Sequence, residues 1–126
     1  MDKVVHFEIP YDDIERVKNF YQDIFGWEIQ SIPEMNYNMV HTVAVDEKQM
    51  PVEKGAINGG MYKRDENSSQ TPVIVINVNS IDESVNKVLG KGGTIFRDKV
   101  SVGEMGFYAQ VKDTEGNIIG LWEVKK

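Results

Sequence analysis

The order of the expected secondary-structure elements repeats once along this chain, and the repeat limits the fold more than any other feature. Residues 4–9 have a strand pattern, residues 13–25 have a helical pattern, and Gly26 follows before further strand patterns. About 67 residues later the order returns, with a strand pattern at 73–78 and a helical pattern at 81–89. The repeat predicts two similar βαβββ modules and an α+β fold.

The modules divide a single domain of 126 residues, a length that supports one hydrophobic core. We expect module one at 1–62, a polar connector at 63–71 and module two at 72–126. The remaining strands are expected at 27–32, 37–45, 56–62, 94–96, 106–112 and 117–124.

Alternation in the first strand separates an apolar face from a polar one. Val5, Phe7 and Ile9 share one face, which suits packing under a helix. His6 and Glu8 share the other face, together with Val4. This second face is therefore expected to be the wetter one.

Local signals define both helices. Asp12 and Asp13 are suitable N-cap residues for the first helix, and Ser80 with Glu83 has capping-box spacing for the second. Gly26 suits a left-handed residue just after the first helix. The expected buried stripe of the first helix consists of Ile14, Val17, Tyr21, Ile24 and Phe25.

Charge and composition exclude several function classes. The net charge of −6 argues against a nucleic-acid partner and against an anionic membrane surface. The chain has no cysteine, so a disulfide framework, a thiolate metal site and a thiol nucleophile are all excluded. Without a secretory pattern or a long apolar run, we expect a cytoplasmic protein.

An ordered set of short motifs resembles the vicinal oxygen chelate superfamily, which contains glyoxalase I, extradiol dioxygenases, methylmalonyl-CoA epimerase and the bleomycin-resistance proteins. The motifs are His-Phe-Glu-Ile-Pro at 6–10, Phe-Gly-Trp at 25–27, Lys-Gly-Gly at 91–93, Asp-Thr-Glu-Gly-Asn at 113–117 and Gly-Leu-Trp-Glu at 120–123. Within the superfamily the chain is most similar to bacterial and archaeal proteins described as "predicted enzyme related to lactoylglutathione lyase". The resemblance implies a cupped, half-closed, barrel-like sheet with helices on its outer face.

The resemblance also implies a cavity in which four side chains hold a divalent cation. His6 matches the first of these positions. Asn58 or Gly59, Val73 and Gly120 fall on the other three, where carboxylates or histidine are expected. Because His6 is the one retained ligand, we expect no family-type metal and no other cofactor.

Two interpretations of the cavity-facing residues remain open. His6 and Glu8 would be catalytic if the carboxylate tunes the imidazole, or they would be hydrogen-bonded polar residues at a cavity rim or dimer seam. Ligand-pocket candidates are Asn58, Gly59, Gly120 and Trp122, of which Trp122 is favoured as a pocket wall because it shares a face with Gly120.

Two functions are therefore expected as alternatives. The first is a glyoxalase-like lyase or isomerase acting on a small oxygenated metabolite, with His6 as base and Glu8 as polariser. The second is a metal-free protein of the bleomycin-resistance type that binds or sequesters a small molecule without catalysis. In both cases the expected partners are a small-molecule ligand and a second copy of the chain in a homodimer.

Overall fold

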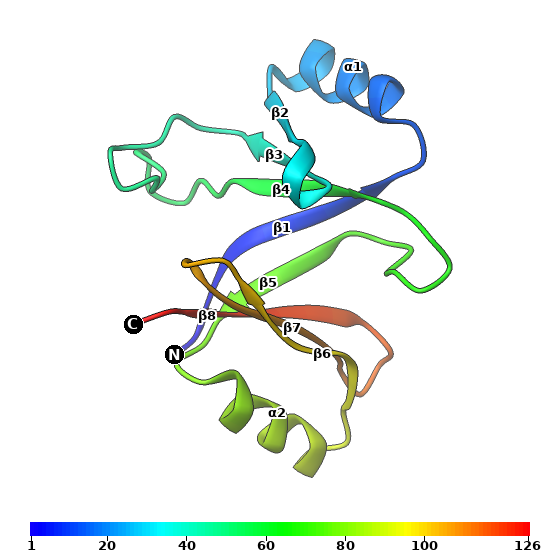
Figure 1. The fold of residues 1–126 in the computed structure, drawn as a ribbon, viewed down its shortest axis with the longest axis vertical. Coiled ribbons are helices and arrows are strands. Elements are labelled where there is room, and N and C mark those ends of the chain that lie inside the picture. The colour runs from blue at the N-terminus through cyan, green and yellow to red at the C-terminus, as the bar shows by residue number, and fades with distance from the viewer. The chain divides into compact units, whose positions relative to one another are not determined.

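The structure is a computed structural model that describes residues 1–126. Its elements are labelled in Figure 1. The chain forms two compact units, which are described separately below. The first unit is His6–Pro72, and the second unit is Val73–Lys126 together with Met1–Val5.

The first unit contains one helix and four strands. Its elements are β1 (Lys3–Tyr11, which begins in the second unit), α1 (Ile14–Phe25), β2 (Glu28–Ile32), a 3-10 turn (Pro33–Met35), β3 (Tyr37–His41) and β4 (Gly59–Lys63). The strands are ordered β2-β3-β4-β1, with β1 parallel to β4 and the other pairs antiparallel.

The second unit repeats this arrangement. Its elements are β5 (Val73–Asn77), α2 (Ile81–Gly90), β6 (Thr94–Val102), β7 (Gly106–Lys112) and β8 (Ile118–Val124). The order is β6-β7-β8-β5, with β5 parallel to β8 and the other pairs antiparallel. Two helices, and four strands in each unit with the same order and pairing, confirm the predicted α+β fold with a repeated βαβββ pattern.

The helix ends follow the predicted capping signals. Asp13 is the N-cap of α1 and accepts a hydrogen bond from the Arg16 N–H at 3.0 Å. Gly26 ends α1 in the left-handed region, at φ 71°. Ser80 caps α2 and accepts from the Glu83 N–H at 3.2 Å. Neither helix is long and apolar enough to cross a membrane.

Each unit has its own hydrophobic core. In the first unit Ile29, Val40 and Met61 are buried, with Phe7, Ile9, Tyr11, Val17, Tyr21 and Trp27 packed against them. In the second unit the buried residues are Val78, Ile81, Ala109, Val111 and Leu121. The prediction for α1 was partly wrong, because Ile24 and Phe25 are both 58% exposed.

Three predicted strand boundaries were wrong. The strand expected at 56–62 begins at Gly59. The strand expected at 37–45 ends at His41. Beyond that point the Asn58 side chain accepts hydrogen bonds from the backbone N–H groups of Thr42 and Val43, so these groups leave the ladder. The strand expected at 94–96 continues to Val102, because β6 pairs with β7 along this length despite two register shifts.

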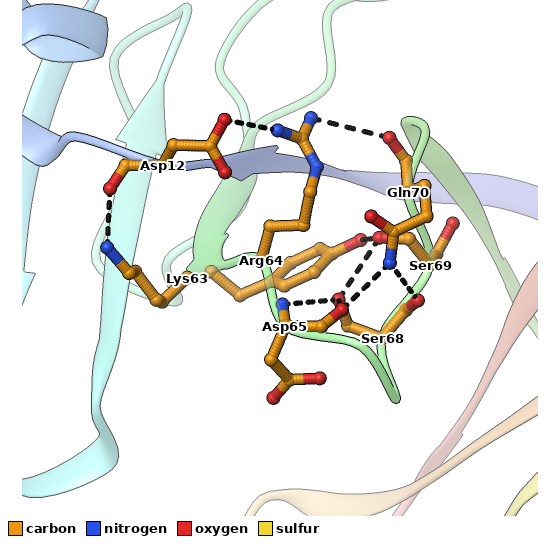
Figure 2. Close-up of polar contacts among 8 residues, drawn as sticks. Asp12, Lys63, Arg64, Asp65, Ser68, Ser69 and Gln70 are labelled. Carbon is orange, nitrogen blue, oxygen red and sulfur yellow. Dashed lines mark hydrogen bonds and ion pairs between the residues drawn. The ribbon is translucent and has the colours of Figure 1, made fainter.

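The polar segment after β4 is a compact hydrogen-bonded loop of the first unit. Figure 2 shows Arg64 between the Asp12 carboxylate, at 2.7 Å, and the Gln70 carbonyl, at 3.3 Å. The Gln70 side-chain amide donates to the Asp65 carbonyl at 2.8 Å, and Ser69 is only 2% exposed. Asp12 therefore holds this loop rather than capping α1.

Candidate functional site

His6, Glu8 and Tyr37 form a chain of hydrogen bonds in the first unit. His6 and Glu8 lie on the face of β1 opposite to Phe7 and Ile9, which pack in the core. Tyr37 begins β3, and its hydroxyl lies 3.1 Å from His6 Nε2 and 3.1 Å from Glu8 Oε2. The tyrosine therefore links the two polar residues that the alternation of β1 places on one face.

The hydrogen-bond directions follow from the number of protons available. The Tyr37 hydroxyl has one hydrogen, which it donates to Glu8 Oε2. Its contact with His6 is then an N–H donation from Nε2 to the hydroxyl oxygen. A neutral imidazole that carries its proton on Nε2 has its lone pair on Nδ1, so His6 can accept a proton there.

Burial governs the charge of this cluster. Glu8 is 9% exposed, and His6 is half-buried. Desolvation by burial lowers the pKa of His6 from 6.5 to about 4, because the charged imidazolium loses its hydration. His6 is therefore neutral at pH 7, and the hydrogen-bond directions place its one ring proton on Nε2.

Gly60 makes room for the tyrosine. Gly60 has two Cα partners, which are Glu8 in the parallel β1–β4 pair and Met39 in the antiparallel β3–β4 pair. A Cβ atom on Gly60 would lie 1.8 Å from the Tyr37 hydroxyl oxygen, so any side chain there is incompatible with this position of Tyr37. The sequence signal for Gly60 was a pair of adjacent glycines inside a strand, of which Gly59 was the predicted pocket residue.

The first-unit pocket candidates have other roles in the structure. Asn58 accepts from the Thr42 and Val43 N–H groups at 2.8 and 3.2 Å, and it donates to the Val43 carbonyl at 3.3 Å. A Cβ atom on Gly59 would lie 2.5 Å from the Phe7 carbonyl oxygen and 2.6 Å from the Phe7 ring. Gly59 thus faces the core side of β4, away from His6 and Glu8.

The second unit has the same tyrosine-over-glycine arrangement. Gly120 is the Cα partner of Val75 and of Gln110, so it holds the position that Gly60 holds in the first unit. A Cβ atom on Gly120 would lie 2.7 Å from the Tyr108 hydroxyl. Val75 stands where the first unit has Glu8, and Val73 stands where it has His6.

Trp122 lies opposite Tyr108 in the β7–β8 pair and is half-buried. Its ring covers Gly106, because a Cβ atom there would lie 2.8 Å from Trp122 Cζ2. The space beside Gly120 is occupied by Tyr108 and the Val75 side chain. Glu123 points to the helix side, where its carboxylate accepts from the Ile81 N–H at 2.9 Å.

The residues present do not fit the divalent metal that the fold family implies. No group of three or more histidine, cysteine, aspartate or glutamate side chains is arranged to hold a metal ion. His41 lines a separate hollow of about 380 Å³ with Glu28, its partner in the β2–β3 pair. Two side chains do not complete a four-ligand site.

Comparisons with known proteins agree with this fold. The profile of the bleomycin resistance protein-like N-terminal family matches residues 3–42. A glyoxylase-like domain-containing protein from Didymella fabae is 30% identical over 114 residues, which are 87% of this chain and 84% of the relative.

Two solved structures share the whole fold. A glyoxalase/bleomycin resistance/dioxygenase superfamily member from Vibrio splendidus 12B01 aligns with a TM-score of 0.60 and 15% identity, covering 98% of this chain and 99% of that one. Methylmalonyl-CoA epimerase from Mycobacterium tuberculosis aligns with a TM-score of 0.61 and 14% identity, covering 98% and 88%. The chain therefore belongs to the glyoxalase-like family of the vicinal oxygen chelate superfamily.

Proposed function

We propose that this protein is a lyase or isomerase that moves a proton on a carbon next to a carbonyl group, without a metal ion. The observation that carries the proposal is the hydrogen-bond chain from His6 through Tyr37 to Glu8. It places a neutral imidazole and a carboxylate on one sheet face, joined by a group that both donates and accepts.

The chain of bonds gives each residue a role. His6 Nδ1 takes the proton from the substrate carbon, and the bonding electrons move into the carbonyl to form an enolate. The imidazolium that results donates its Nε2–H to Tyr37, which donates to the Glu8 carboxylate, so negative charge offsets the new positive charge. Return of the proton to the same or a neighbouring carbon completes an isomerisation, and expulsion of a leaving group completes a lyase reaction.

The relatives support the reaction class. The matching structures include methylmalonyl-CoA epimerases, and one is described as a complex with methylmalonyl-CoA and NH4+. The relative from Didymella fabae is described as a glyoxylase-like domain-containing protein. The epimerase structures are only 14 to 16% identical to this chain, so they show a shared fold but do not identify the substrate. The substrate has to be found by experiment.

Hydrogen exchange in D2O tests the proposal. Chelator-treated protein would be incubated with methylmalonyl-CoA, hydroxyacetone and 2-oxobutanoate, and deuterium incorporation followed by mass spectrometry. We expect exchange with at least one of these compounds, and a fall of about 100-fold or more in His6→Gln and Glu8→Gln.

His41→Gln is the matched control, because His41 lies on the same sheet face as Tyr37 but lines a different hollow. Its exchange rate should equal that of the wild type. Exchange that survives His6→Gln, or no exchange with any of the compounds, would refute the proposed reaction.

The second candidate function is metal-free binding of a small molecule, as in the bleomycin-resistance proteins. The family match at 3–42 favours it, because this segment contains His6, Glu8 and Tyr37. Fluorescence of Trp122 in a Trp27→Phe variant, titrated with planar aromatic compounds, tests it. Saturable binding without turnover would favour sequestration, and the absence of any response would exclude it.

We also propose that the chain forms a homodimer. Phe20, Ile24 and Phe25 on α1 are 53 to 58% exposed, and such apolar surface is stabilised when a second subunit covers it. Sedimentation at micromolar concentration should give twice the chain mass. A Phe20→Glu and Phe25→Glu variant should then be monomeric, whereas a monomeric wild type would contradict the proposal.

A further inference from the structure

Gln110 in β7 has a buried oxygen atom with no hydrogen-bond partner. The residue is 5% exposed, and its Nε2 donates to the Tyr108 hydroxyl at 2.9 Å. Its Oε1 is buried and accepts no hydrogen bond. Buried acceptors of this kind are rare in native proteins, because a lost bond to water normally has to be replaced.

The position of Gln110 in the repeat shows that this amide is specific to the second unit. Gln110 is the Cα partner of Gly120, as Met39 is the partner of Gly60 in the first unit. The second unit therefore keeps a tyrosine hydroxyl over a glycine. It has Val75 in place of a carboxylate, and it gains an amide in place of a thioether.

The surroundings select the chemical class of ligand. Oε1 is an acceptor, so its partner must be a donor such as a hydroxyl, an amide N–H or an ammonium group. Arg97 is the Cα partner of Gln110 on β6, and its positive charge disfavours an ammonium group beside it. A neutral hydroxyl or amide N–H is the donor that fits.

We propose that Gln110 and Tyr108 form a ligand-binding position for a neutral hydrogen-bond donor, with Gln110 Oε1 as the acceptor and Tyr108 orienting the amide. The position contains no acid or base of its own, so it binds rather than reacts. It is closed in this structure, and a ligand reaches Oε1 by a rotation of the Gln110 side chain or of a neighbour. The inference rests on the second unit alone and is independent of the role of His6.

Two fragments of the same shape test this position by NMR. 2-Pyrrolidinone has a ring N–H where cyclopentanone has a methylene group, so they differ in one donor. In the wild type we expect 2-pyrrolidinone to shift the side-chain amide signals of Gln110 and to bind about 5- to 10-fold more tightly than cyclopentanone.

Gln110→Met removes both polar atoms at similar volume and should abolish the preference between the fragments. Tyr108→Phe should weaken the preference, and it provides a second test if Gln110→Met does not fold. His6→Gln should retain the preference, which separates this inference from the proposed reaction. The inference would be overturned if the wild type bound the two fragments with equal affinity. It would also be overturned if Gln110→Met kept the same preference as the wild type. Both results are expected if Oε1 only holds a buried water.

Discussion

Replacement of Gly60 by alanine should remove the Tyr37 hydroxyl from its place between His6 and Glu8. The added Cβ atom would lie 1.8 Å from the hydroxyl oxygen and 2.0 Å from Cζ, far inside any real contact distance. Gly60 is buried in β4 between two paired strands, so its backbone has little room to move. The tyrosine ring must therefore turn away.

The expected loss of stability follows from the contacts that break. Two hydrogen bonds are lost, at about 1 kcal/mol each, and the displaced ring loses about 1 kcal/mol of burial. The replacement of glycine by alanine also adds about 0.7 kcal/mol to the free energy of unfolding, because alanine lowers the conformational entropy of the unfolded chain. The free energy of unfolding should thus fall by about 2 kcal/mol.

Urea denaturation followed by fluorescence measures this change. Gly90→Ala is the control, because a Cβ atom at the end of α2 has no neighbour within 4 Å. Gly120→Ala should be intermediate, since its closest contact is 2.7 Å. In a Tyr37→Ala background Gly60→Ala should cost almost nothing. A Gly60→Ala variant as stable as Gly90→Ala would refute the placement of Tyr37.

Two further changes probe groups around the site and the repeat. Because the pKa of His6 is lowered from 6.5 to about 4, the unfolded chain binds a proton that the folded chain does not, and stability should fall by up to about 3 kcal/mol as the pH drops from 6.5 to 4. Urea denaturation at several pH values should show this fall in the wild type but not in His6→Gln, and an equal fall in both would contradict it. Glu123→Ala should lower stability by about 1 kcal/mol, because the carboxylate accepts from the first N–H of α2. The exposed Glu104→Ala is the control, and equal stability of the two variants would count against this role.

Local signals in the sequence were sufficient for most of the fold. Asp13, Ser80 and Gly26 act within one helical turn, so the helix ends could be predicted without knowledge of the rest of the chain. The alternation of side chains along a strand is also a local property, so it was sufficient to place His6 and Glu8 on one face. The extent of β6 could not be predicted in this way, because its last residues are strand only through their pairing with β7.

The candidate site depends on strand register, which the sequence does not encode locally. Gly59 and Gly60 are adjacent in β4, and either could have been the residue that faces His6 and Glu8. Pairing of Glu8 with Gly60, and of Phe7 with Gly59, decides between them. Tyr37 could not be placed beside His6 and Glu8 from the sequence, because its position depends on the pairing of β3 with β4, whose starts lie 22 positions apart (37 to 59).

A tyrosine hydroxyl, rather than a metal ion, joins His6 to Glu8. Crystals grown with excess Zn²⁺, Ni²⁺ or Mn²⁺ and measured at each absorption edge test it directly. We expect no anomalous peak at His6, and a Tyr37 hydroxyl within hydrogen-bond distance of both His6 and Glu8. An ion bound to His6 Nε2, with Tyr37 displaced, would contradict it.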